Sequence, residues 1–167
     1  MGQHLIVANQ TLGGDALDRA VQDRIQRGEG RFHILVPMTV PKHETAAWVD
    51  GFPVPEGMTF AQISEARQVM EEAERRREVE LAEARRRAEH RLALMLDRVR
   101  ALGGQASGEV GDPDPVVAVE DLLLHRSFDG IIISTLPARI SRWLKLDLPS
   151  QVERMTDVPV TTIEAEE

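Results

Sequence analysis

Short apolar runs alternate with longer amphipathic segments along this chain. The segments that read as strands are residues 4–9, 32–38, 105–111, 130–135 and 159–164. Between them, apolar residues recur at steps of three and four, which is the spacing of a helix that covers a core with one face. Strands that alternate with helices form parallel sheets, and right-handed crossovers place helices on both faces. The pattern therefore predicts an α/β fold with a five-stranded parallel sheet.

The second helical segment is much longer than the others. Its apolar positions run from Phe60 to Leu102, which predicts one long helix or two helices in series. A helix of about forty residues would be about 60 Å long, twice the width of a small domain. Residues 71–87 are mostly charged, and only residues 92–102 are apolar enough to pack firmly on a sheet. The upstream half is expected to project, to bend back, or to pack against a partner.

An irregular stretch precedes this helix. Residues 39–57 are rich in Pro and Gly and contain Trp48 and Phe52. Loops of this length without regular structure are uncommon in compact domains and tend to be functional or mobile. The two aromatic residues either pin the loop to the body or form a lid over a ligand. We expect a single domain over residues 1–167, with an irregular loop and a helix extension at about 39–90.

Composition narrows the class of protein. The 167 residues are 42% hydrophobic and 29% charged, and the formal net charge is −8. An acidic chain is a poor general ligand for nucleic acid. No apolar stretch approaches the roughly twenty residues of a membrane span, and the first residues do not resemble a signal peptide. Cysteine is absent and the five histidines are scattered, so no metal site is predicted. We expect a cytoplasmic protein that binds neither nucleic acid nor a membrane.

The motifs of common enzyme classes are missing. Gly103 and Gly108 have the spacing of a phosphate-binding P-loop, but Glu109 stands where a lysine is needed. The chain also lacks a G-x-S-x-G nucleophile motif and a dinucleotide-binding glycine fingerprint. No pair of acidic residues stands out as a catalytic dyad. The sequence therefore identifies no catalytic residue.

The last quarter of the chain carries the most specific signal. A buried-strand pattern, Phe128 to Thr135, is followed by a polar loop with several cations and by a short helix that opens near Pro149. This arrangement resembles the end of a universal stress protein domain. In that family the loop carries G-x-x-G, about nine residues, and then G-S or G-T, and it holds a nucleotide. Here Ser134 and Pro137 stand near the first two glycine positions, and either Leu146-Asp147 or Asp147-Leu148 replaces Gly-Ser.

The resemblance implies a binding or regulatory module with ATP or AMP as its ligand. We expect the strand order 3-2-1-4-5, and in open α/β sheets ligands bind where the order reverses, here between strands one and four. Asn9 stands where many family members have Asp, and Gly111 where they have the glycine of Gly-Asp-Pro. Val36 and Pro37 are candidates for the wall around an adenine. The full set of candidate nucleotide contacts is Asn9, Gln10, Thr11, Val36, Pro37, Gly111, Ser134, Thr135, Arg139, Ser141 and Arg142.

Alternatives remain open at this level. Arg139, Arg142 and Lys145 either replace the lost glycine cradle or pair with acids such as Asp147 and Asp129. The protein could also hydrolyse ATP slowly, with Asn9 and Ser134 as polar contacts, or it could be a dimeric interaction protein without a nucleotide. Family members commonly dimerise through the last strand, so residues 158–164 are expected at a homodimer interface. The long helix is a second candidate surface, for a protein partner.

Overall fold

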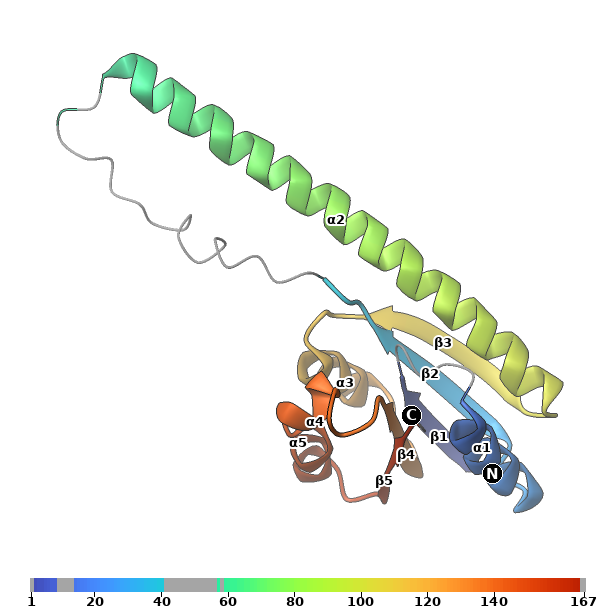
Figure 1. The fold of residues 1–167 in the computed structure, drawn as a ribbon. Coiled ribbons are helices and arrows are strands. Elements are labelled where there is room, and N and C mark those ends of the chain that lie inside the picture. Colours follow the sequence, from blue (N-terminus) through green and yellow to red (C-terminus); the bar gives the residue numbers. More distant parts are fainter. Residues whose placement is uncertain (1, 9–13, 41–56, 58, 166–167) are drawn as a thin grey trace. The chain divides into compact units, whose positions relative to one another are not determined.

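The fold is a parallel α/β sheet, seen here in a computed structural model that describes residues 2–8, 14–40, 57 and 59–165. Its elements are β1 (Gln3–Val7), α1 (Asp15–Gln26), β2 (Arg31–Pro37), α2 (Phe60–Ala101), β3 (Gln105–Gly111), α3 (Pro115–His125), β4 (Gly130–Thr135), α4 (Arg142–Lys145), α5 (Leu148–Met155) and β5 (Val160–Glu164). The five strands are all parallel, in the order β3-β2-β1-β4-β5 (Figure 1). This confirms the predicted fold class and strand order.

The central strands are apolar on both sides because helices cover both faces of the sheet. Successive strand residues point to opposite faces, so Leu5 and Val7 of β1 join one core cluster and Ile6 joins the other. The first cluster also holds buried residues of α3 and α5, and the second holds buried residues of α1 and of the last part of α2. The continuous apolar run of β4 has the same explanation, since all six of its residues are buried.

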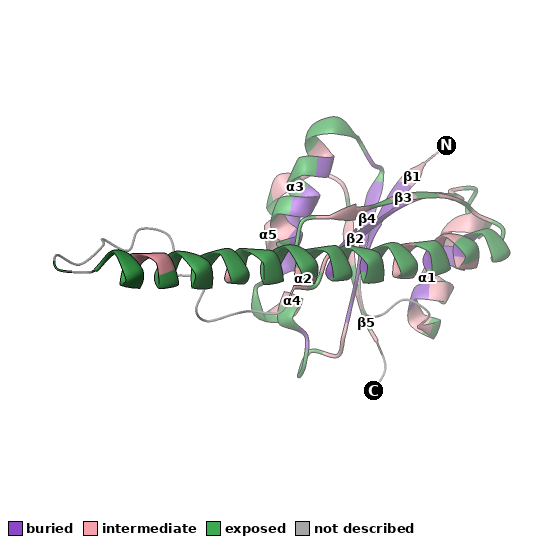
Figure 2. Cartoon of the chain, turned by 90° about the horizontal axis from the view of Figure 1, so that it is seen from above, coloured by how far each residue is buried: buried purple, intermediate pink, exposed green. Residues whose placement is uncertain are grey.

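Helix α2 is one continuous helix of 42 residues, about 63 Å long. Its buried positions are Ala84, Ala88, Met95 and Val99, so burial begins upstream of the predicted 92–102 segment. The two alanines belong to the apolar positions of the predicted helix, but small residues carry little apolar signal, so their burial was not predicted. No residue between 60 and 83 is buried, and Figure 2 shows that part of α2 in the colour of exposed residues with few exceptions. None of the helices in the described part of the chain combines the length and apolar character of a membrane span.

The downstream part of α2 is fixed by close packing and by one ion pair. A Cβ at Gly108 of β3 would lie 2.4 Å from Cδ1 of Leu92 and 2.7 Å from the carbonyl oxygen of Ile34. Glycine at that position therefore lets the helix lie close to the strand. Arg98 of α2 donates from Nε to Oδ1 of Asp18 in α1 at 2.6 Å, and its Nη2 pairs with the second carboxylate oxygen.

The chain divides into two compact units, one formed by residues 1–39 and 85–167 and the other by residues 40–84. The first unit contains the whole sheet. The second contains the upstream part of α2. The expectation of one domain over the whole chain stays a prediction, and Trp48 and Phe52 lie outside the described residues.

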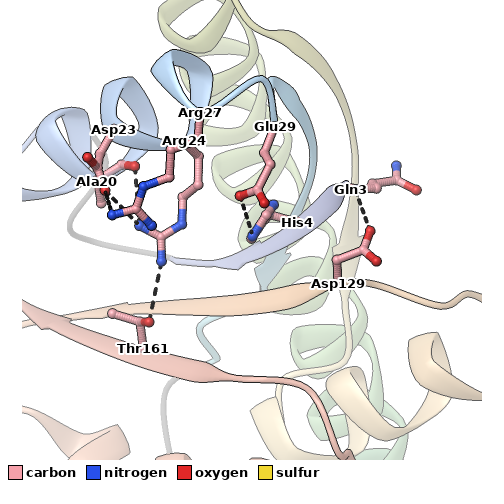
Figure 3. A network of polar contacts seen from close by, with 9 residues as sticks. All are labelled: Gln3, His4, Ala20, Asp23, Arg24, Arg27, Glu29, Asp129 and Thr161. Atoms are coloured by element: carbon pink, nitrogen blue, oxygen red, sulfur yellow. Dashed lines mark hydrogen bonds and ion pairs between the residues drawn. The ribbon is translucent and has the colours of Figure 1, made fainter. Parts of the chain in front are cut away.

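A polar network ties the elements together at the amino-terminal edge of the sheet (Figure 3). The backbone N–H of Gln3 donates to Oδ2 of Asp129 at 2.8 Å, which joins the start of β1 to the residue before β4. Nη2 of Arg24 donates to Oγ1 of Thr161 at 3.4 Å, which joins α1 to β5. These contacts occupy the edge opposite the strand ends at which ligands bind in this class of fold.

Candidate functional site

The candidate site lies at the carboxyl-terminal edge of the sheet, where strand β1 ends before its two neighbours. Val7, the last residue of β1, pairs with Leu35 of β2 and with Ile133 of β4. Both neighbours continue for two residues beyond that level, β2 to Pro37 and β4 to Thr135. We call Val36, Pro37, Ser134 and Thr135 the switch-point edge, because the strand order reverses between β1 and β4.

The side chains of the switch-point edge are buried, and several already have internal roles. Val36 is fully buried and belongs to the core cluster under α1 and α2. Oγ1 of Thr135 donates to the carbonyl oxygen of Leu136 at 2.9 Å, and the Thr135 carbonyl accepts from the N–H of Ala165 at 2.8 Å. Ser134 is 2% exposed. Among the nucleotide contacts expected at this edge, the Thr135 hydroxyl therefore already makes a hydrogen bond within the protein.

The loop after β4 contains a tight turn and a short helix. The carbonyl oxygen of Pro137 accepts hydrogen bonds from the N–H groups of Ile140 and Ser141, both at 2.9 Å. Oγ of Ser141 accepts from the N–H of Leu144 at 3.2 Å and so caps α4. This helix is absent from the sequence-based prediction, although a serine before Arg142 is a helix-start signal. Ser141 is only 2% exposed and its hydroxyl already caps the helix, so capping is sufficient to explain this residue.

The same loop carries exposed cations, and the two acidic residues that were expected to pair with them contact other groups instead. Asp147 pairs with Arg154 at 3.9 Å, and the carboxylate of Asp129 accepts from the backbone of Gln3. Arg142 and Lys145 form no ion pair with the residues that the structure describes. Arg139, in the same loop, is also exposed. In a chain of net charge −8, this loop is a locally cationic surface beside the switch-point edge.

Gly111, another predicted contact, has a packing role that is sufficient to explain it. It pairs with Pro37 at the end of β3, and its carbonyl oxygen accepts from the N–H of Met38 at 3.1 Å. A Cβ at this position would lie 2.8 Å from Cδ1 of Leu35 and 2.9 Å from Cβ of Ala118. Only glycine therefore lets α3 approach this end of the sheet without a shift of the surrounding atoms.

The structure thus brings one group of predicted residues to the same edge of the sheet and leaves another group undescribed. Val36, Pro37, Gly111, Ser134 and Thr135 lie at the carboxyl ends of β2, β3 and β4. Arg139, Ser141 and Arg142 follow in the loop after β4. Asn9, Gln10 and Thr11 lie outside the described residues, so their part in the site stays a prediction.

No family model matches this sequence, and no curated protein sequence matches it either. Among solved structures, a universal stress protein from Archaeoglobus fulgidus superposes with a TM-score of 0.51 at 12% sequence identity, over 98% of this chain and 93% of the other. This chain has the universal stress protein fold. A universal stress protein solved in complex with cAMP is also similar, with a TM-score of 0.44 and 15% identity, over 99% of this chain and all of the other. At such identities the likeness concerns the fold.

Proposed function

We propose that this universal-stress-protein-like module binds an adenine nucleotide, ATP or AMP, at the switch-point edge and acts as a binding or regulatory protein. The observation that carries the proposal is the cationic loop after β4. It begins where β4 ends, and it presents Arg142 and Lys145 without an ion pair among the described residues. An exposed cation pair beside the ligand-binding edge of an acidic α/β protein favours an anionic ligand.

Side-chain cations would carry the phosphate affinity in this site. The glycines that let backbone N–H groups approach phosphate in the family are replaced here, and Pro137 has no N–H to donate. The hydroxyls of Thr135 and Ser141 already make internal hydrogen bonds. Arginine binds phosphate oxygens with two parallel hydrogen bonds and can replace a lost backbone cradle. Asn9 would contact the nucleoside.

Titration calorimetry with ATP, AMP and adenosine tests the proposal. Arg142→Ala and Lys145→Ala should each weaken ATP binding about 10- to 100-fold, the effect of losing a charge-assisted hydrogen bond. Both should leave adenosine binding nearly unchanged. Arg154→Ala is the matched control, because Arg154 is an exposed cation that pairs with Asp147. Added salt should weaken ATP binding more than adenosine binding.

The outcome that contradicts the proposal is equally specific. If the wild-type protein shows no saturable heat and no thermal shift with millimolar ATP, ADP or AMP, the altered loop has lost the nucleotide site. The alternative function, a dimeric interaction protein without a nucleotide, would then apply. One observation favours that alternative independently: residues 60–83 of α2 contribute no buried side chain.

A further inference from the structure

The upstream part of α2, residues 60–83, exposes apolar side chains that nothing in the described residues buries. The large ones are Phe60 (86% exposed), Val69 (66%), Met70 (39%), Val79 (56%) and Leu81 (45%). Helices in globular proteins derive most of their stability from packing one apolar face. A helical segment without a buried face is therefore expected to find a partner.

One side of this segment has the pattern of a helix that pairs with another helix. Ile63, Ala66, Met70, Ala73 and Arg77 follow each other at steps of three and four. These are the a and d positions of a heptad repeat, which place side chains along one seam. We call these five residues the α2 stripe. Ile63 and Ala73 are half-buried and the other three are exposed.

We propose that the α2 stripe pairs with the α2 stripe of a second copy of this chain, in antiparallel orientation. The charges on the stripe decide the direction. In a parallel pair in register, Arg77 would face Arg77 of the second copy across the seam, which is unfavourable. In an antiparallel pair with Met70 opposite Ala73 of the second copy, Arg77 lies opposite Ala66. Its aliphatic stem can then cover that small residue.

The residues that flank the stripe support the same direction. Arg67 and Glu74 both occupy e positions, and e positions face each other in an antiparallel pair. In the register given above, Arg67 of each copy lies opposite Glu74 of the other, so two complementary pairs form. Arg67 and Glu74 make no ion pair with the described residues. By contrast, Glu71 pairs with Arg75 within the helix at 3.8 Å.

The small side chains of the stripe are consistent with close pairing. Ala66 and Ala73 allow two helix backbones to approach, and Met70 can adapt its shape to fill the space between them. Exposed ion pairs contribute little to affinity, so the charges set the orientation, and the contact comes from Met70, Ala73 and the aliphatic stem of Arg77 at the centre of the seam. We therefore expect a reversible dimer that strengthens at high protein concentration.

Disulfide mapping in the 167-residue chain tests the orientation directly, because the sequence contains no cysteine. The antiparallel register places Ala66 against residue 77 of the second copy. Two copies of residue 66 would then be about 16 Å apart along the helix axis, beyond the reach of a disulfide. In a glutathione redox buffer, a mixture of Ala66→Cys and Arg77→Cys proteins should form the mixed dimer. Ala66→Cys protein alone should stay monomeric on a non-reducing gel.

Charge exchange provides the second measurement, by sedimentation equilibrium over a wide concentration range. Arg67→Glu should weaken dimerisation at least threefold, and the double variant R67E/E74R should restore it. Arg75→Glu is the matched control: it makes the same charge change on the opposite side of the helix. Ready self-linking of Ala66→Cys protein would instead indicate a parallel pair. A wild-type chain that stays monomeric at about 500 µM and forms no mixed disulfide would overturn the proposal.

Discussion

Two valines on the same helix offer a sharp test of how α2 is anchored. Val99 is fully buried against the sheet, whereas Val79 is 56% exposed. The substitutions Val99→Ala and Val79→Ala remove the same two methyl groups from the same secondary structure. Any difference between their effects on stability therefore reports packing and not helix propensity.

The magnitudes follow from burial. Each buried methylene-sized group contributes about 0.8 kcal/mol, so Val99→Ala loses about 1.6 kcal/mol by transfer, and the cavity adds to this. The higher helix propensity of alanine returns about 0.5 kcal/mol in both variants. The net expectation is a loss of about 1–2.5 kcal/mol for Val99→Ala. For Val79→Ala we expect no loss, or a gain of up to about 0.5 kcal/mol.

Urea unfolding followed by far-UV circular dichroism measures both free energies, at low protein concentration so that self-association does not contribute. Val79 also lies off the α2 stripe, so helix pairing should not alter its result. The m-value should be the same for both variants and the wild type. Equal destabilisation by the two substitutions would refute the reasoning, since it would mean that residue 79 is as well packed as residue 99.

Three further predictions follow from other parts of the structure. Burial, and for His33 also the nearby charge of Arg126, lowers the pKa of His4 and His33 below the usual 6.5. As the pH falls, these histidines therefore bind protons at a higher pH in the unfolded chain than in the folded one, so the free energy of unfolding should fall from pH 7.5 to pH 5.5. An equally steep fall in the double variant H4Q/H33Q would contradict this. Gly111→Ala should lower the free energy of unfolding by about 1–3 kcal/mol through overpacking. Its ATP affinity, measured well below the melting temperature, should equal that of the wild type; a loss of affinity without a loss of stability would instead indicate that Gly111 contacts the ligand. Pairing of β5 with a second copy should be abolished by Thr162→Pro, because the Ala165 N–H and the Pro159 carbonyl bond to β4 and the alternate residue 162 therefore faces the open edge. The measurement is light scattering of the Arg67→Glu protein with and without Thr162→Pro, so that pairing of α2 contributes little; a dimeric mass that is the same in both would argue against the β5 interface.

The site was predictable only in part. The position of the switch-point edge follows from the strand order, and the cations of the loop after β4 are visible in the sequence. What the sequence could not show is which hydroxyls are already engaged: Thr135 with the Leu136 carbonyl and Ser141 with the Leu144 N–H. Such contacts depend on the path of the loop through a turn and a four-residue helix, and this path carries little periodic signal. The sequence alone allows Gly111 to be a ligand contact, whereas the structure shows Ala118 of α3 packed against this position.

By itself, the apolar pattern of the sequence determined the fold class, and the expected strand order came with the family resemblance. Apolar runs such as Ile131–Ile133 are typical of strands that helices cover on both faces, and their alternation with helical segments indicates the architecture. Only the tertiary structure decided how far α2 is anchored. Ala88 is buried in the core cluster that also holds Ile34 and Val36 of β2, and Gly108 of β3 permits the close approach of α2 at Leu92. Met70 and Leu81 have stronger apolar signals and are exposed. Burial depends on what lies opposite a residue in space, and a helical period of three and four is the same whether its apolar face meets a sheet, a second copy or water.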